Sequence, residues 1–227
     1  CFMESMATLG IAGFGYGIRY EHGLFKQGFD QGWQVERPED WLAFGNPWEF
    51  ERPEAVYPIR FGGHLPDVMD GAGRGCHVWE GGQRMLAVAY DTMIAGYGGR
   101  HVNTLRLWSG QSGNLIDLEA FNRGDYKEAV AEQIAAESIS RVLYPNDATQ
   151  AGQELRLKQE YFFTAASLMD IVRRHLVTHA SLDNLADHVA IQLNDTHPAI
   201  AVPELLRLLV DEHGMDWEKA FDIAQRT

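Results

Sequence analysis

Cysteine is scarce in this chain of 227 residues, which contains Cys1 and Cys76 and no others. Two cysteines provide neither a disulfide framework nor a set of ligands with metal-binding spacing. We therefore expect a reducing compartment and no metal site.

Basic residues are also in the minority. The chain has 19 Lys and Arg against 32 Asp and Glu, which gives a formal net charge of −13. Binding to nucleic acid needs clustered cations, whereas the basic residues here are scattered through an acidic chain. The composition therefore argues against a nucleic-acid partner and, for the same reason, against an anionic membrane.

Long apolar runs are missing as well. None approaches the roughly 20 residues that a membrane-spanning helix needs, and the first residues lack the basic flank of a signal peptide, so we expect a cytoplasmic protein. The hydrophobic content of 45% is sufficient for a packed core. Because the chain begins at Cys1 rather than at a methionine, and both ends fall in helical patterns, we interpret it as an excerpt of a longer protein.

The pattern of apolar residues predicts an α/β protein. Residues 13–109 are rich in strands, with alternating or β-branched runs at 56–61, 85–90 and 102–108. Residues 115–176 are mainly helical, with apolar stripes at helical spacing over 125–143 and 153–176. Residues 177–227 are predicted to form helix, strand and helix, as in a βα layer.

One segment concentrates polar groups directly after an apolar run. Residues 190–193 form the predicted strand, and Asn194, Asp195, Thr196 and His197 follow it before Pro198. Open α/β sheets bind ligands at the carboxyl ends of their strands, which favours a site here. The alternative is that these short polar side chains cap the helix that follows.

Seven sequence blocks resemble, in the same order, blocks of the α-glucan phosphorylase family, which includes glycogen, starch and maltodextrin phosphorylases. The two most specific are ISRVLYPND at 139–147 and QLNDTHP at 192–198. The other five lie at 5–10, 15–21, 90–92, 102–108 and 154–162. Together the blocks span nearly the whole chain, which is therefore identified as a member of this family and, from its loop sequence, as a bacterial-type one.

The resemblance implies a fold and an activity. The fold would be part of the N-terminal Rossmann-like domain of a two-domain GT-B glycosyltransferase, with a β-rich inserted region. Residues 1–227 would form a partial N-terminal domain made of the portions 13–109, 115–176 and 177–227, while the C-terminal domain that binds pyridoxal 5'-phosphate through a lysine would be absent. The full-length enzyme would transfer the terminal glucosyl unit of an α-1,4-glucan to inorganic phosphate with retention, and the fragment alone would be inactive.

The resemblance also assigns roles to residues of the two most specific blocks. Asp195 and His197 would lie beside the reacting sugar, with Asn194 in contact with substrate. Asp147 would lie on a mobile gate loop near the phosphate region, and Tyr144, Asn146 and Arg156 would line the sugar subsites. A plain Pro-Asn-Asp turn is the alternative for the loop, and pairing with Glu160 four residues on is the alternative for Arg156.

Two further features concern regulation and assembly. Arg173 and Arg174 match the arginines that bind an effector phosphate in animal enzymes, although cations are also favoured at a helix C-terminus. The helix predicted over 125–143 matches one that projects from a subunit to form the homodimer, and its alternative is an amphipathic helix lying on its own sheet. Residues 148–151 read ATQA, where animal enzymes carry an aromatic pair that stacks an inhibitory purine.

Other functions remain open at this level. A maltodextrin phosphorylase would share every quoted block, and a catalytically inactive glucan-binding homologue would keep the fold. A nucleotide-sugar glycosyltransferase would share the two-lobed architecture but would not account for the seven blocks.

Overall fold

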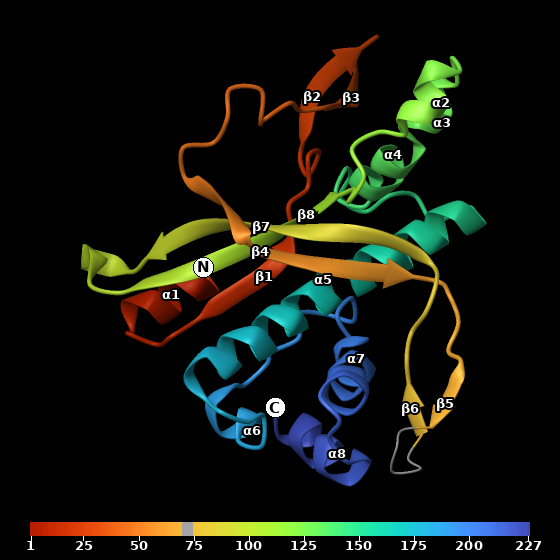
Figure 1. The fold of residues 1–227 in the computed structure, drawn as a ribbon. Coiled ribbons are helices and arrows are strands. Elements are labelled where there is room, and N and C mark those ends of the chain that lie inside the picture. Colours follow the sequence, from red (N-terminus) through yellow and green to blue (C-terminus); the bar gives the residue numbers. More distant parts are fainter. Residues whose placement is uncertain (70–74) are drawn as a thin grey trace. The chain divides into compact units, whose positions relative to one another are not determined.

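The computed structural model describes the backbone of residues 1–69 and 75–227 (Figure 1). It describes the side chains of all residues except 67–76, so the side chain of Cys76 lies outside the described part. The chain forms two compact units. The first consists of Cys1–Val56 and Met85–Gln159, and the second of Tyr57–Arg84 and Glu160–Thr227.

A mixed four-stranded sheet has the order β1-β8-β7-β4. Strand β1 (Phe14–Ile18) pairs in parallel with β8 (Val102–Gln111), and β7 (Gln83–Ala95) pairs antiparallel to β8. Strand β4 (Glu49–Phe61) forms the other edge. These strands confirm the predictions at 56–61, 85–90 and 102–108, where β-branched and aromatic residues alternate with small or polar ones.

The core of the first unit is built around β8. Trp108 is completely buried and its ring stacks on that of Tyr16, with centroids 6.3 Å apart. On neighbouring strands, Asp91 and Arg106 are directly opposed and form two hydrogen bonds of 2.7 and 2.8 Å in a buried ion pair. Such a pair tolerates burial because each charge satisfies the other.

Within the described residues, the first unit contains seven further elements. They are α1 (Phe2–Thr8), the hairpin of β2 (Phe25–Asp30) and β3 (Trp33–Pro38), the 3₁₀ turn η1 (Tyr97–Gly99), α2 (Leu118–Asn122), α3 (Tyr126–Ala129) and α4 (Ala131–Ser138). Asp117 begins α2 because its carboxylate accepts hydrogen bonds from the amides of Glu119 and Ala120.

The single helix predicted over 125–143 is wrong. The backbone leaves helical geometry at Val130 (φ −116°, ψ 9°), and α4 ends at Ser138. Beyond that point the carbonyls are taken by other partners, since the side-chain amide of Gln159 donates to the carbonyls of Ile139 and Val142 at 2.9 and 3.0 Å. The helix itself ends in a tighter turn, in which the amides of Ile139 and Ser140 donate to the carbonyls of Ala136 and Glu137, three residues earlier.

Helix α4 packs directly on β8 where the strand carries Gly110. A Cβ at this position would lie 2.5 Å from the carbonyl oxygen of Ala136, which is itself buried. Glycine is therefore required for the close approach of helix and strand.

The second unit is mainly helical. It contains most of α5 (Gln150–Thr178), α6 (Leu185–His188), α7 (Ala201–Arg207), a π-helical turn η2 (Leu208–Glu212) and α8 (Trp217–Arg226), together with the short strands β5 (Asp67–Met69) and β6 (Gly75–His77). Helix α5 confirms the prediction at 153–176. The core of the second unit contains buried apolar residues from α5, α6, α7, η2 and α8, among them Leu168, Val172, Leu185, Leu205, Leu209 and Ile223.

The strand predicted at 190–193 is not found, since no residue of 177–227, all of which are described, belongs to a strand. The side chains nevertheless alternate, with Val189, Ile191 and Leu193 partly buried against the helical core. A strand needs a neighbour to hydrogen-bond with, whereas the amide of Ile191 donates to the carbonyl of Thr227 at the end of α8.

Among the described residues, no helix combines the length and the apolar composition that crossing a membrane requires.

The Gly110 contact yields a prediction. Gly110→Ala should destabilise the full-length protein by about 1–3 kcal/mol, because the added methyl group forces α4 away from β8. The denaturant midpoint measures this effect. Gly113→Ala is the control, since nothing lies within 4 Å of a Cβ there; equal midpoints for the two variants would contradict the proposed packing.

Candidate active site

Asp195 occupies an unusual backbone conformation. Its φ is 66°, in the left-handed region that aspartate and asparagine tolerate better than other residues with a side chain. Its Oδ1 accepts hydrogen bonds from the amide of Thr196 at 2.6 Å and from the hydroxyl of Thr196 at 3.3 Å. The hydrogen bond from the Thr196 amide lowers the pKa of Asp195, and the charge of His197 lowers it further, so this carboxylate stays ionised.

His197 lies between two carboxylates. Its Nε2 is 4.0 Å from Oδ2 of Asp195, and its Nδ1 is 3.5 Å from Oε1 of Glu160 on α5. Its side chain is about 30% exposed, so the imidazole is partly sheltered yet accessible. The structure thus brings together Asp195 and His197, as predicted. It also adds Glu160, which the motif did not indicate because Glu160 lies 37 residues before His197 in the chain.

The capping alternative for this segment is wrong. Helix α7 begins at Ala201, its N-cap residue is Ile200, and no side chain caps it. Asn194 is exposed and precedes the first residue of the helix by seven positions, with a turn over 197–200 between them. The polar side chains at 194–197 therefore do not cap helix α7.

The predicted gate-loop residues lie together in the first unit. Oδ1 of Asn146 accepts a hydrogen bond from the amide of Ala148 at 2.8 Å, so the tip of the loop is an Asx turn. Asp147 points its carboxylate to Arg156, with 2.6 Å between Oδ2 and Nη1. The Arg156 guanidinium lies 5.6 Å from the ring centroid of Tyr144, which is exposed and has a φ of 50°.

Arg156 therefore does not pair with Glu160, the alternative that its helical spacing offered. It pairs with Asp147, nine residues earlier in the chain, while Glu160 faces His197. A loop that folds back on the helix presents a nearer carboxylate than the next helical turn does.

Arg173 binds the buried carboxylate of Asp170. It donates from Nη2 to Oδ1 of Asp170 at 3.1 Å and from Nε to the hydroxyl of Tyr57 at 2.5 Å, and Tyr57 in turn donates to Asp170 at 2.7 Å. Burial, followed by the hydrogen bond to Asp170, raises the pKa of Tyr57 to about 12. Since α5 runs to Thr178, Arg173 and Arg174 precede its last turn, so the helix C-terminus does not account for them.

A protein-family model described as carbohydrate phosphorylase matches residues 1–227. The chain belongs to the carbohydrate phosphorylase family.

Curated relatives agree with this assignment. The chain is 52% identical to the glycogen phosphorylase of Haemophilus influenzae over 225 residues, which are 99% of the chain. It is 51% identical over its whole length to the muscle form of human glycogen phosphorylase and to the glycogen phosphorylase of Pasteurella multocida. The chain spans about 27% of the length of these relatives.

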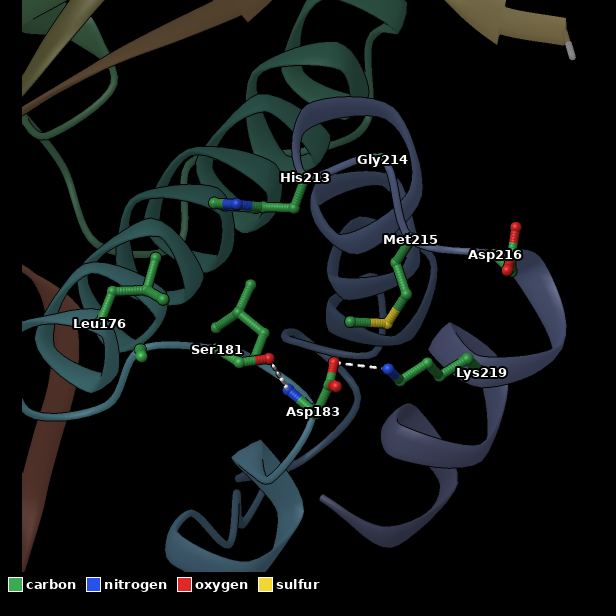
Figure 2. A pocket seen from close by; sticks show the side chains of 10 residues that line it. Leu176, Ser181, Asp183, His213, Gly214, Met215, Asp216 and Lys219 are labelled. Atoms are coloured by element: carbon green, nitrogen blue, oxygen red, sulfur yellow. Dashed lines mark hydrogen bonds and ion pairs between the residues drawn. The ribbon is translucent and has the colours of Figure 1, made fainter. Parts of the chain in front are cut away.

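Two cavities of this phosphorylase-family chain lie in the second unit, and neither is lined by Asp195 or His197. The larger, about 760 Å³, is lined by four arginines, among them Arg173, which is bound to Tyr57 and Asp170. The smaller, about 390 Å³, is shown in Figure 2. There Asp183 and Lys219 form an ion pair of 2.6 Å, which lowers the pKa of Asp183. Two of its charged groups thus bind one another.

Three histidines without a sequence motif form a cluster. His175 is buried, and its ring stacks on that of His179 with centroids 4.2 Å apart; the ring centroid of His188 lies 4.2 Å from that of His179. Within the described residues, however, no group of three or more His, Cys, Asp or Glu side chains is arranged to hold a metal ion.

The network around Tyr57 yields a prediction. Its folded-state pKa of about 12 lies above the ordinary value of 10, so the stability that the neutral phenol provides is complete below pH 10 and is lost as the pH rises towards 12. Asp170→Asn should lower the pKa of Tyr57, because the charge that opposes the phenolate is removed.

Ultraviolet titration of phenolate, taken as the difference between a protein with Tyr57 and its Tyr57→Phe variant, measures this pKa. A Tyr57 that ionises near its ordinary value, or that is indifferent to Asp170→Asn, would contradict the assignment.

Proposed function

We propose that the full-length protein is a glycogen phosphorylase. It would transfer the terminal glucosyl unit of an α-1,4-glucan to inorganic phosphate and release α-D-glucose 1-phosphate with retained configuration. The observation that carries this proposal is the match of the whole chain to the family, with relatives named glycogen phosphorylase at about 50% identity. Their names favour glycogen over maltodextrin as the substrate class.

The architecture follows from the same proposal. The chain would be part of the N-terminal Rossmann-like domain of a GT-B fold, with a β-rich insertion, and the mixed sheet with its helices supports this. The portions 13–109, 115–176 and 177–227 would be its successive parts, and the C-terminal domain would complete the enzyme.

The proposed cofactor is pyridoxal 5'-phosphate, whose phosphate would supply proton transfer in the C-terminal domain. We propose no residue of this chain as its ligand, because the lysine that would bind it belongs to the C-terminal domain that the family resemblance implies. Lys158 and Lys219 instead form ion pairs of 2.6 Å with Glu154 and Asp183.

The second unit would contribute hydrogen bonds to the sugar. His197, oriented by Asp195 and Glu160, can donate to a hydroxyl group, while the ionised carboxylate of Asp195 can accept from one. Asn194 is exposed beside them and can do both. Such contacts stabilise the transition state when the site closes and excludes water.

The first unit would contribute the gate loop. Asp147 carries the charge that would oppose phosphate entry, and Asn146, Tyr144 and Arg156 would line the sugar subsites. Arg173 and Arg174 would contact an effector phosphate, for which Arg173 would have to exchange its bonds to Tyr57 and Asp170.

Phosphorolysis assays of the full-length protein on glycogen and on maltoheptaose, together with the absorbance of bound pyridoxal phosphate, test the proposal. Activity on glycogen supports it. A protein that binds glucan without phosphorolysis would instead be the inactive homologue, and preference for maltoheptaose would identify a maltodextrin phosphorylase.

His197→Ala should lower kcat/KM by about tenfold to a thousandfold, as expected for the loss of one or two polar hydrogen bonds in a dry site. The content of cofactor should not change. His64→Ala is the matched control, since His64 is exposed and lies 3.8 Å from Glu80 in the same unit. Equal kcat/KM for the two variants would remove His197 from the site.

The proposed homodimer would use the exposed apolar side of α2–α4. Tyr126 and Ile134 are 61% and 56% exposed, whereas Ile139, in the same predicted stripe, is buried within the unit. Further exposed apolar residues adjoin them in sequence: Leu115, Ile116, Leu118 and Phe121. Because water disfavours such a surface, a second subunit that covers it would stabilise the assembly.

Tyr126→Asp combined with Ile134→Asp should therefore weaken the full-length dimer without unfolding it. Analytical sedimentation at micromolar concentration measures the change. Lys127→Asp, which adds charge to α3 without removing apolar surface, is the control. A double variant that remains dimeric, or a wild-type protein that is monomeric, would refute this interface.

A further inference from the structure

The loop over 144–149 lies on the first turns of α5, and three helix residues hold it there. Gly152 approaches so closely that a Cβ would overlap the carbonyl oxygen of Asn146. The side-chain amide of Gln153 donates to the carbonyl of Asp147 at 3.2 Å. Arg156, one turn further along the helix, binds the Asp147 carboxylate at 2.6 Å. Positions three and four residues apart share one face of a helix, so these contacts form a single surface for the loop.

Arg156 is the one of the three that engages two side chains of the loop. Its guanidinium binds Asp147 through Nη1 and lies over the ring of Tyr144 at 5.6 Å. Arginine suits this double task because a planar guanidinium can stack on a ring while its edge donates hydrogen bonds. Tyr144 has a φ of 50°, an uncommon conformation for a residue with a side chain, so its placement depends on such contacts.

The strength of the ion pair between Arg156 and Asp147 determines how firmly it can hold the loop. The Asp147 side chain is 56% exposed and that of Arg156 31%, so solvent screens the pair. Exposed ion pairs change an equilibrium by up to about fivefold. Arg156 therefore biases the loop towards this position without locking it, and the loop can leave when another interaction competes.

We propose that Arg156 is a positioning residue that holds the loop 144–149 on α5 by binding the Asp147 carboxylate and stacking on Tyr144. This inference rests on the proposed function for its effect on catalysis, since it assigns the placement of Asp147 to Arg156. In this geometry Nη1 donates to Asp147, so a ligand oxygen that took this donor would have to displace the carboxylate. Release of the loop would free a cation and an anion together.

Hydrogen exchange of the full-length protein tests the placement without reference to activity. Arg156→Gln should speed exchange of the peptide covering 144–153 by about twofold to fivefold, and Arg156→Lys should restore part of the protection by keeping the charge. In the wild type, added salt should speed this exchange, because it screens the pair. Lys158→Gln is the matched control, since Lys158 pairs with Glu154 on the same helix.

Kinetics then separate positioning from direct contact with substrate. If Arg156 acts through Asp147, the double variant of Arg156→Gln with Asp147→Asn should be no slower in kcat/KM than the slower single variant. Independent contacts with substrate would make the two losses multiply. Arg156→Lys should recover part of kcat while KM changes little.

Unchanged exchange in Arg156→Gln, or multiplied losses in the double variant, would overturn the proposal. Absence of phosphorolysis would refute the proposed function alone, because the exchange experiment would still report on the loop.

Discussion

The buried amide of Gln159 is the contact on which the loop region depends. A buried side-chain amide has two hydrogens that both need acceptors, and Gln159 satisfies them with the carbonyls of Ile139 and Val142. Both carbonyls belong to the segment between the end of α4 at Ser138 and the loop that starts at 144. One glutamine thus ties the segment that leads to Tyr144, Asn146 and Asp147 to the helix that follows it.

The same helix supplies a charged partner to each group of candidate site residues. Arg156 binds Asp147 in the first unit, and Glu160 faces His197 in the second. Asp170 is buried there with Tyr57 and Arg173 as partners. In a chain of net charge −13, repulsion between acids would destabilise such sites, and these paired cations and phenols relieve it.

Polar groups in the second unit divide into those that pair internally and those that remain accessible. Asp183 with Lys219 and Asp170 with Arg173 are saturated by one another, so cavities beside them give little sign of a ligand. Asp195 and His197 lie 4.0 Å apart, and their side chains are 64% and 30% exposed, so another molecule can reach both. This accessibility, together with the family match, is the reason to prefer the 194–197 segment as the site.

Sequence alone determined the family, the strands at 56–61, 85–90 and 102–108, and the helix at 153–176, because these depend on local periodicity and on blocks that can be read in order. It also selected Asp195, His197, Asp147 and Arg156 as one set of site candidates. Tertiary structure alone decided their partners: Glu160 beside His197, Asp147 on Arg156, and Asp170 behind Arg173. It also decided that residues 190–193 form no strand and that the helix over 125–143 breaks at Val130. Hydrogen bonds between residues far apart in the chain compete with local preference, and which of them wins depends on what the fold brings within reach.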